Sequence, residues 1–155
     1  MLAKMLARRV VPIALGTTLA FGAVAPNVGA TTLAEGGSTP VGFSVDRGSY
    51  GSAQFNGTLT WDGEGGYTVS GQVGVNLPSP GRMTAWLEYG GEREGWKQSN
   101  EADTGAGGHI SKVDYANVNV SGKIPKGDKL ELRVSSWMAS INAYKASPKQ
   151  QFVIS

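Results

Sequence analysis

The alternation of apolar and polar side chains is most regular between Gln54 and Leu77. A period of two residues is typical of a strand that buries one of its faces. The apolar positions of shared parity are Phe55, Leu59, Trp61, Tyr67, Val69, Val73, Val75 and Leu77. Residues 62–66, Asp-Gly-Glu-Gly-Gly, interrupt the alternation with turn-forming residues. The segment therefore predicts a long β-hairpin around this loop.

The two apolar sets of this hairpin must share a face, and a slip of one residue would turn every side chain to the wrong side. The register that meets this condition pairs Trp61 with Tyr67, Leu59 with Val69, and Phe55 with Val73. The same register places Gly57 opposite Gly71. Because two facing glycines leave a gap, we expect a side chain from a second layer to fill it. The hairpin thus predicts a sheet packed on another sheet.

Shorter segments with the same alternation continue along the chain. We expect strands at 41–46, 82–89, 113–122, 130–136 and 152–154, a short edge strand at 93–99, and a bulge near Ala116 or Asn117. Pro78 and Pro80 cannot donate ladder hydrogen bonds, so residues 77–81 mark an expected change of sheet. Residues 100–108 and 139–149 are expected to be loops. The pattern favours an all-β, antiparallel β-sandwich of about seven or eight strands, immunoglobulin-like or jelly-roll in character.

The first 30 residues have the composition of an export signal. Lys4, Arg8 and Arg9 precede a mostly apolar run at 10–24, and small residues at 28–30 precede an expected cleavage before Thr31. The run is short and interrupted by a proline and a glycine, so a retained membrane anchor is the weaker alternative. We therefore expect a cleaved signal peptide at 1–30, a flexible lead-in at 31–40 and a single domain at 41–155. The mature protein is expected to be secreted and extracellular, with no membrane attachment.

The net charge and the absence of cysteine exclude several classes of partner and of site. The whole chain has a formal net charge of +2, but residues 31–155 carry 11 basic and 12 acidic side chains, a net charge of −1. Nucleic-acid binding is therefore not expected, because it needs a concentrated basic surface. The chain has no cysteine, which excludes disulfides, thiolate metal sites and lipid attachment through cysteine. Packing alone must hold this small exported domain together.

Three motifs resemble the opening pattern of small exported β-sandwich proteins that are common in actinobacteria. They are Gly-Thr-Leu-Thr-Trp at 57–61, Tyr-Thr-Val-Ser-Gly-Gln-Val at 67–73 and Ala-Trp-Leu at 85–87. The resemblance extends over about the first half of the mature chain and implies the sandwich fold. It implies no catalytic residues. Members of the family often carry paired cysteines, which this chain lacks.

Catalytic and metal-binding chemistry has little support in the sequence. His109 is the only histidine and no nucleophile elbow lies near it, so we expect a surface histidine or one at the start of a strand. Carboxylates gather at 88–103, where the acids are Glu88, Glu92, Glu94, Glu101 and Asp103. Such a loop can serve a glycoside hydrolase, or with Asn100 it can bind calcium through oxygen ligands. Its spacing fixes neither geometry, so no catalytic residue, metal or cofactor is assigned.

The aromatic side chains give the more specific indication. Trp61 belongs to the core parity, whereas Trp86 has the parity opposite to Leu87 and Trp96 lies among charged residues, so both are expected to face solvent. The candidate ligand-binding residues are Trp86, Trp96, Tyr89, Trp137 and Tyr144. Exposed aromatic rings on a sheet stack on sugars or anchor protein partners. The alternative is that loops cover both sides of the sheet. Trp137, Met138, Ile141 and Tyr144 form a second apolar set, expected to be a lid or a contact patch.

These patterns predict a secreted, non-enzymatic binding or interaction domain that recognises carbohydrate or an envelope or extracellular partner through exposed aromatics. Two alternatives stay open. One is a small secreted hydrolase that uses the acidic loop at 88–103, and the other is a purely structural extracellular protein. The oligomeric state is not predicted.

Overall fold

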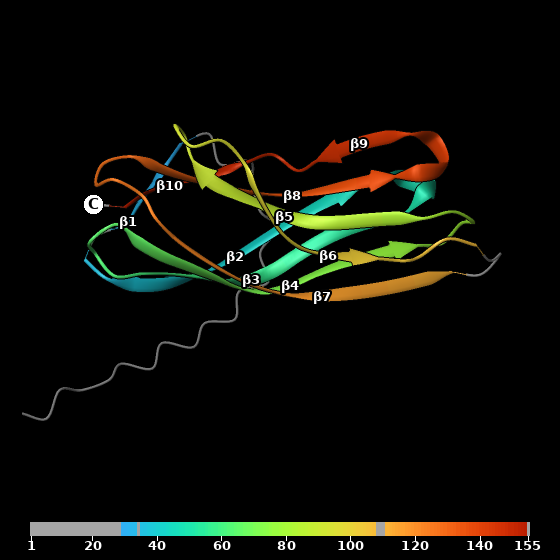
Figure 1. The fold of residues 1–155 in the computed structure, drawn as a ribbon, viewed down its shortest axis with the longest axis horizontal. Coiled ribbons are helices and arrows are strands. Elements are labelled where there is room, and N and C mark those ends of the chain that lie inside the picture. The colour runs from blue at the N-terminus through green and yellow to red at the C-terminus, as the bar shows by residue number, and fades with distance from the viewer. Residues whose placement is uncertain (1–28, 34, 108–110, 155) are drawn as a thin grey trace, which may run out of the picture.

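The computed structural model describes residues 29–33, 35–107 and 111–154, and these contain ten strands in two packed sheets (Figure 1). The expected all-β sandwich is confirmed, with more strands than predicted. Figure 1 shows the two layers, with β8 and β9 in the upper one and β7 in the lower one. Residues 1–28 of the expected signal peptide and His109 lie outside the described residues.

One sheet has four antiparallel strands in the order β2-β3-β4-β7. They are β2 (Gly37–Asp46), β3 (Ser52–Trp61), β4 (Gly66–Leu77) and β7 (Lys112–Lys123). The other sheet has six strands in the order β1-β10-β8-β5-β6, with β9 also paired to β8. They are β1 (Thr31–Leu33), β5 (Met83–Gly91), β6 (Lys97–Asp103), β8 (Lys129–Met138), β9 (Ala143–Ala146) and β10 (Gln150–Ile154). The 3-10 turns are η1 (Gly48–Tyr50) and η2 (Ala139–Ile141).

The predicted hairpin register is confirmed in β3 and β4, including the pairing of Gly57 with Gly71. The Asp62 side chain fixes the turn, since its Oδ1 accepts hydrogen bonds from the backbone N–H of Glu64 at 2.7 Å and of Gly66 at 2.9 Å. Gly63 and Gly65 have φ angles of 81° and 94°, which side chains with a Cβ rarely adopt. The turn residues thus set the register that the apolar pattern requires.

At the facing glycines, a side chain of the hairpin itself lies in the gap. An ideal Cβ at Gly57 would lie 2.6 Å from Cζ of Phe55 and 3.0 Å from Cα of Gly71. The ring of Phe55 therefore bends along its own strand and occupies the space beside Gly57. A residue of the same layer therefore takes up part of the gap.

The change of sheet at 77–81 is confirmed, because β4 belongs to the four-stranded sheet and β5 to the six-stranded one. Between the sheets lies one continuous apolar core. Its largest fully buried side chains are Phe55, Leu59, Leu77, Met83, Leu87, Ile124, Leu130, Leu132, Met138, Ile154, Val69 and Val73. Both sheets contribute to this list in alternating positions, as sandwich packing requires.

The predicted bulge near Ala116 or Asn117 is wrong. Strand β7 pairs with β4 in an unshifted register from Lys112 to Lys123. Val113 and Tyr115 point outward and each is 54% exposed, so their apolar character misled the assignment of the buried face. The irregularity lies instead between Trp86 and Glu88, where the pairing of β5 with β6 shifts.

Three segments expected to lack regular structure contain strands. Thr31–Leu33 pairs in parallel with β10, and β2 begins at Gly37, so the expected flexible lead-in at 31–40 is largely strand. Strand β6 extends to Asp103 instead of ending at residue 99, and β9 lies within the expected loop at 139–149. Backbone pairing with a neighbouring strand stabilises such edges without any apolar alternation of their own.

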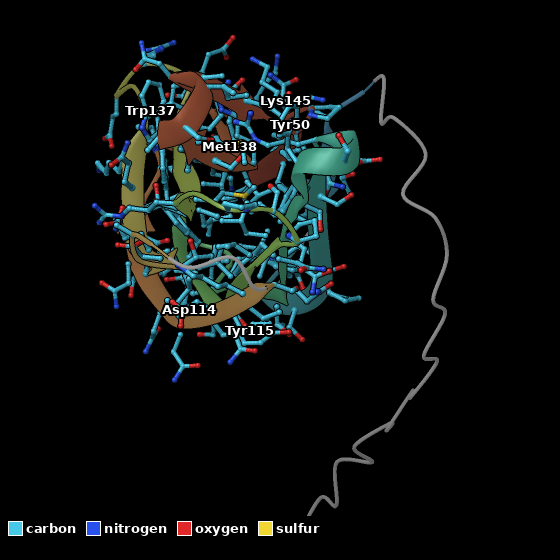
Figure 2. The ribbon with its side chains drawn as sticks, turned by 90° about the vertical axis from the view of Figure 1, so that its right-hand side faces the viewer. Tyr50, Asp114, Tyr115, Trp137, Met138 and Lys145 are labelled. Carbon is cyan, nitrogen blue, oxygen red and sulfur yellow. The ribbon has the colours of Figure 1, made fainter. Side chains whose placement is uncertain are left out.

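Two sets of polar contacts close the sides of the sandwich. Beside β6 and β7, Asn100 Nδ2 donates to the Asn117 carbonyl at 3.4 Å, and the Asp103 N–H donates to Asp114 Oδ2 at 2.8 Å. At the other side, Arg47 Nη2 donates to the carbonyls of Ser136 at 2.8 Å and Ala143 at 3.0 Å. Figure 2 looks onto this end of the molecule, with Tyr50 and Lys145 labelled near its upper edge.

Candidate functional site

The outer face of the six-stranded sheet carries an aromatic and charged cluster. Its members are Trp86 and Glu88 from β5, Arg133, Ser135 and Trp137 from β8, Tyr144 from β9, and Trp96 just before β6. The strand register sets Trp86 beside Ser135, Glu88 beside Arg133, and Trp137 beside Tyr144. We call this set the aromatic face. It alternates with the core residues of the same strands.

Glu88 is the centre of this cluster and is only 5% exposed. Its carboxylate accepts hydrogen bonds from Trp86 Nε1 at 3.2 Å, from Arg133 Nε at 2.5 Å and from the Tyr144 hydroxyl at 3.2 Å. The Tyr144 hydroxyl is also 2.9 Å from Ser135 Oγ. Burial by itself raises the pKa of Glu88, but the hydrogen bonds from Arg133, Trp86 and Ser135 outweigh it and hold the pKa below its ordinary value. Glu88 is therefore a fixed anion within the sheet face.

The aromatic rings extend this contact chain on both sides of Glu88. The Arg133 guanidinium lies 4.1 Å from the centroid of the Trp96 ring, a cation–π contact. The rings of Trp86 and Tyr144 have centroids 6.4 Å apart and are tilted by 38°. The side chains from Tyr144 through Trp86, Glu88 and Arg133 to Trp96 thus form one connected row, which holds each ring in place.

The five predicted ligand-binding residues are only partly brought together. Trp86, Trp96, Trp137 and Tyr144 lie on the aromatic face, whereas Tyr89 points to the opposite side and packs against the core. Trp86 has the predicted outward parity, but it is only 9% exposed, so for this ring the alternative of a covered sheet face holds. Tyr144 of β9 packs against it, in a segment where the sequence predicts a loop. Trp96 and Tyr144, at 37% and 48%, are the exposed rings.

The second apolar set predicted at 137–144 does not form a lid. Met138 is fully buried in the core, while Ile141 is exposed in η2. Trp137 and Tyr144 are paired across β8 and β9. The set is therefore divided between the core, a turn and the aromatic face.

The expected acidic loop is largely strand, and its carboxylates do not converge. Glu88 is paired with Arg133, Glu94 Oε2 accepts from Lys97 Nζ at 3.0 Å, and Asp103 Oδ1 accepts from Arg82 Nε at 2.9 Å. The hydrogen bond from Arg82 lowers the pKa of Asp103. Among the residues the structure describes, no group of three or more acidic or histidine side chains is placed to hold a metal ion. Three of the five carboxylates of this segment, Glu88, Glu94 and Asp103, are therefore engaged by basic side chains.

A second surface lies on the outer face of the four-stranded sheet, and the sequence reasoning missed it. Tyr115 is 54% exposed there, directly opposite Gly74 in the register. Ser52, Gln54, Asn76 and Val113 line a shallow hollow beside it. The sequence does contain a signal for this surface. Polar residues alternate regularly along β3, β4 and β7, and residues 115–121 of β7 carry no charge.

Comparison with known proteins identifies no relative: no protein-family model, curated protein or solved structure matches the chain. In the described part of the chain, no helix is long and apolar enough to span a membrane.

Proposed function

We propose that this chain is an exported, non-enzymatic binding domain that recognises an extracellular protein partner through the aromatic face. The observation that carries the proposal is the connected row from Tyr144 to Trp96, which presents two partly exposed rings on a rigid sheet. Rings held by hydrogen bonds and a cation–π contact lose little conformational freedom on binding. Export is supported by the basic, apolar and small-residue succession in residues 1–30.

A protein fits this face better than a sugar does. Trp86 is almost fully covered, and Trp96 is only 37% exposed with Arg133 against one side of its ring, so these two rings leave little open area for stacking on a sugar. Tryptophan, tyrosine and arginine are the residue types that dominate the binding energy of protein interfaces.

The proposal is tested by retention of extracellular proteins on the immobilised mature protein. We expect a defined set of secreted or surface proteins from the native organism to bind, and Trp96→Ala to weaken that binding about 30-fold, as hot-spot truncation does. Tyr115→Ala is the matched control, because Tyr115 is an exposed tyrosine on the outer face of the other sheet. Unchanged retention by Trp96→Ala, or no retention above the bare matrix, would contradict the proposal and leave a structural role as the alternative.

A further inference from the structure

The outer face of the four-stranded sheet is a regular grid of uncharged polar side chains. The register of its four strands aligns outward residues in rows: Ser44, Gln54, Gly74 and Tyr115, then Gly42, Asn56, Gln72 and Asn117, then Pro40, Thr58, Ser70 and Asn119, then Ser38, Thr60, Thr68 and Ser121. None of these side chains is charged. We call the outward residues of these four rows the neutral face. Since neighbouring strands lie about 4.8 Å apart, each row is roughly 14 Å long.

Charges border the neutral face but do not enter it. Asp46, at the end of β2, aligns with Ser52, Asn76 and Val113 in the next row, and Lys123 lies at the far end of β7. A charged polymer would find no counter-charges on the grid, and its desolvation would go uncompensated. A neutral molecule rich in hydroxyl groups matches amide and hydroxyl side chains, which both donate and accept hydrogen bonds.

The Tyr115 ring forms an aromatic platform at one end of the grid. An ideal Cβ at Gly74 would lie 2.6 Å and 2.7 Å from Cε1 and Cδ1 of Tyr115, so the ring lies over the bare glycine backbone. The ring is nevertheless 54% exposed, which leaves its other side to solvent. In Figure 2, Tyr115 projects at the lower edge of the molecule, away from Trp137. Any side chain at position 74 would displace this ring.

Polar side chains surround the Tyr115 ring, and hydrogen bonds already orient some of them in the absence of a ligand. Gln54, Asn76 and Ser52 line the hollow beside Tyr115. Farther along the grid, Gln72 Nε2 donates to Asn117 Oδ1 at 3.4 Å, and Ser70 Oγ donates to Asn119 Oδ1 at 3.3 Å. These long, exposed hydrogen bonds align the side chains and leave amide donors for a ligand. Such alignment reduces the entropy lost on binding.

We propose that the neutral face binds a chain of neutral sugars, with one ring stacked on Tyr115 and its hydroxyl groups hydrogen-bonded by Gln54 and Asn76. An aromatic ring beside amides and hydroxyls is the combination that sugars require, with apolar C–H groups on one side and hydroxyls at the edge. A protein partner fits less well, because Val113 is the only other large apolar side chain that is exposed among the described residues that line the hollow. This site is independent of the aromatic face, which lies on the other sheet.

The test is native electrophoresis of the mature protein in gels that contain hydroxyethyl cellulose, dextran or galactomannan, with polygalacturonate as the charged comparison. We expect retardation by at least one neutral polymer and little by polygalacturonate. Tyr115→Ala should weaken that binding about tenfold or more, and Gln54→Ala by a smaller factor. Both side chains are exposed, so the variants should fold. Tyr50→Ala is the matched control and should be retarded like the unaltered protein.

Four outcomes would overturn the proposal. They are no retardation in any neutral gel, retardation by polygalacturonate alone, equal retardation of Tyr115→Ala and the unaltered protein, and a dimer in size-exclusion chromatography that Tyr115→Ala dissociates. The last outcome would identify the neutral face as a contact between two copies of the chain. Because Trp96 is not on this face, Trp96→Ala should be retarded like the unaltered protein. The two proposed sites can therefore fail separately.

Discussion

Gly57 lies where the buried side of the hairpin has no room for another atom. The Phe55 ring and the backbone of β4 occupy the space that a Cβ would need. Protein interiors are packed about as densely as organic crystals, so such an insertion cannot be absorbed without movement. Gly42 differs, although it is also a glycine in the same sheet. A Cβ at Gly42 would meet Asn56 Oδ1 at an ordinary 3.4 Å on the outer face.

We therefore expect Gly57→Ala to lower the free energy of unfolding by about 1–3 kcal/mol, the usual range for overpacking. Gly42→Ala should change it by less than about 0.5 kcal/mol, as exposed substitutions do. Urea denaturation of the two variants measures both changes. Equal changes would mean that the Phe55 ring moves aside freely, against the packing described here.

Trp86 shows what the sequence predicts at the scale of one residue. Alternation with Leu87 correctly placed Trp86 outside the core, whereas Tyr89, expected to bind a ligand, shares the parity of Leu87 and packs against the core. It could not predict that Trp86 is nearly covered, because the covering Tyr144 lies on another strand with only four residues, β9. The position of a residue in the alternation predicts which side of the sheet its side chain faces, whereas the exposure of that side chain depends on contacts between segments distant in the chain.

Strands β5, β8 and β9 are tied together by the Glu88 carboxylate, which makes their joint stability depend on pH. Its pKa is lowered in the folded protein, because hydrogen bonds from Arg133, Trp86 and Ser135 outweigh the burial that alone would raise it. A lowered pKa means that the folded state binds the proton less tightly than the unfolded state does. This contribution to stability is therefore complete above the ordinary pKa of 4.5 and is lost as the pH falls through the folded value.

We expect the free energy of unfolding to fall more steeply below about pH 4.5 in the unaltered protein than in Glu88→Gln. At neutral pH the variant should be about 1–3 kcal/mol less stable, because Arg133 loses its partner. Urea denaturation at a series of pH values gives both results. Glu131 and Asp103 also have lowered pKa values, so the variant should keep part of the slope. Identical slopes would show that Glu88 is not held as a stabilising anion.

At the scale of elements, the sequence predicted strands where alternation is long and missed those that depend on a neighbour. Strands β3, β4 and β8 were expected because each buries one complete parity. Strands β1 and β9 have no such pattern and exist through pairing with β10 and β8. In β7 the outward Val113 and Tyr115 suggested the wrong buried face. Residue type alone does not distinguish an exposed apolar side chain from a buried one.

At the scale of the whole molecule, the sandwich presents two outer faces of different chemistry. The aromatic face has ion pairs and rings in mutual contact, whereas the neutral face has uncharged polar side chains and one ring open to solvent. The sequence predicted the two-layer class, since alternation implies a buried side for each sheet. It did not predict the neutral face, because that face appears only when the polar residues of four strands are placed in register.

The most direct test of two separate faces is a backbone and indole N–H nuclear magnetic resonance titration of the labelled mature protein with cellohexaose or maltohexaose. We predict shifts concentrated at Gly74, Tyr115 and their neighbours in β3, β4 and β7, with the indole N–H signals of Trp86 and Trp96 unchanged. Trp86 is a sensitive reporter, because its indole N–H donates to Glu88 at the centre of the aromatic face. Shifts concentrated at the Trp86 and Trp96 indoles, with Tyr115 unaffected, would contradict the assignment of sugar binding to the neutral face.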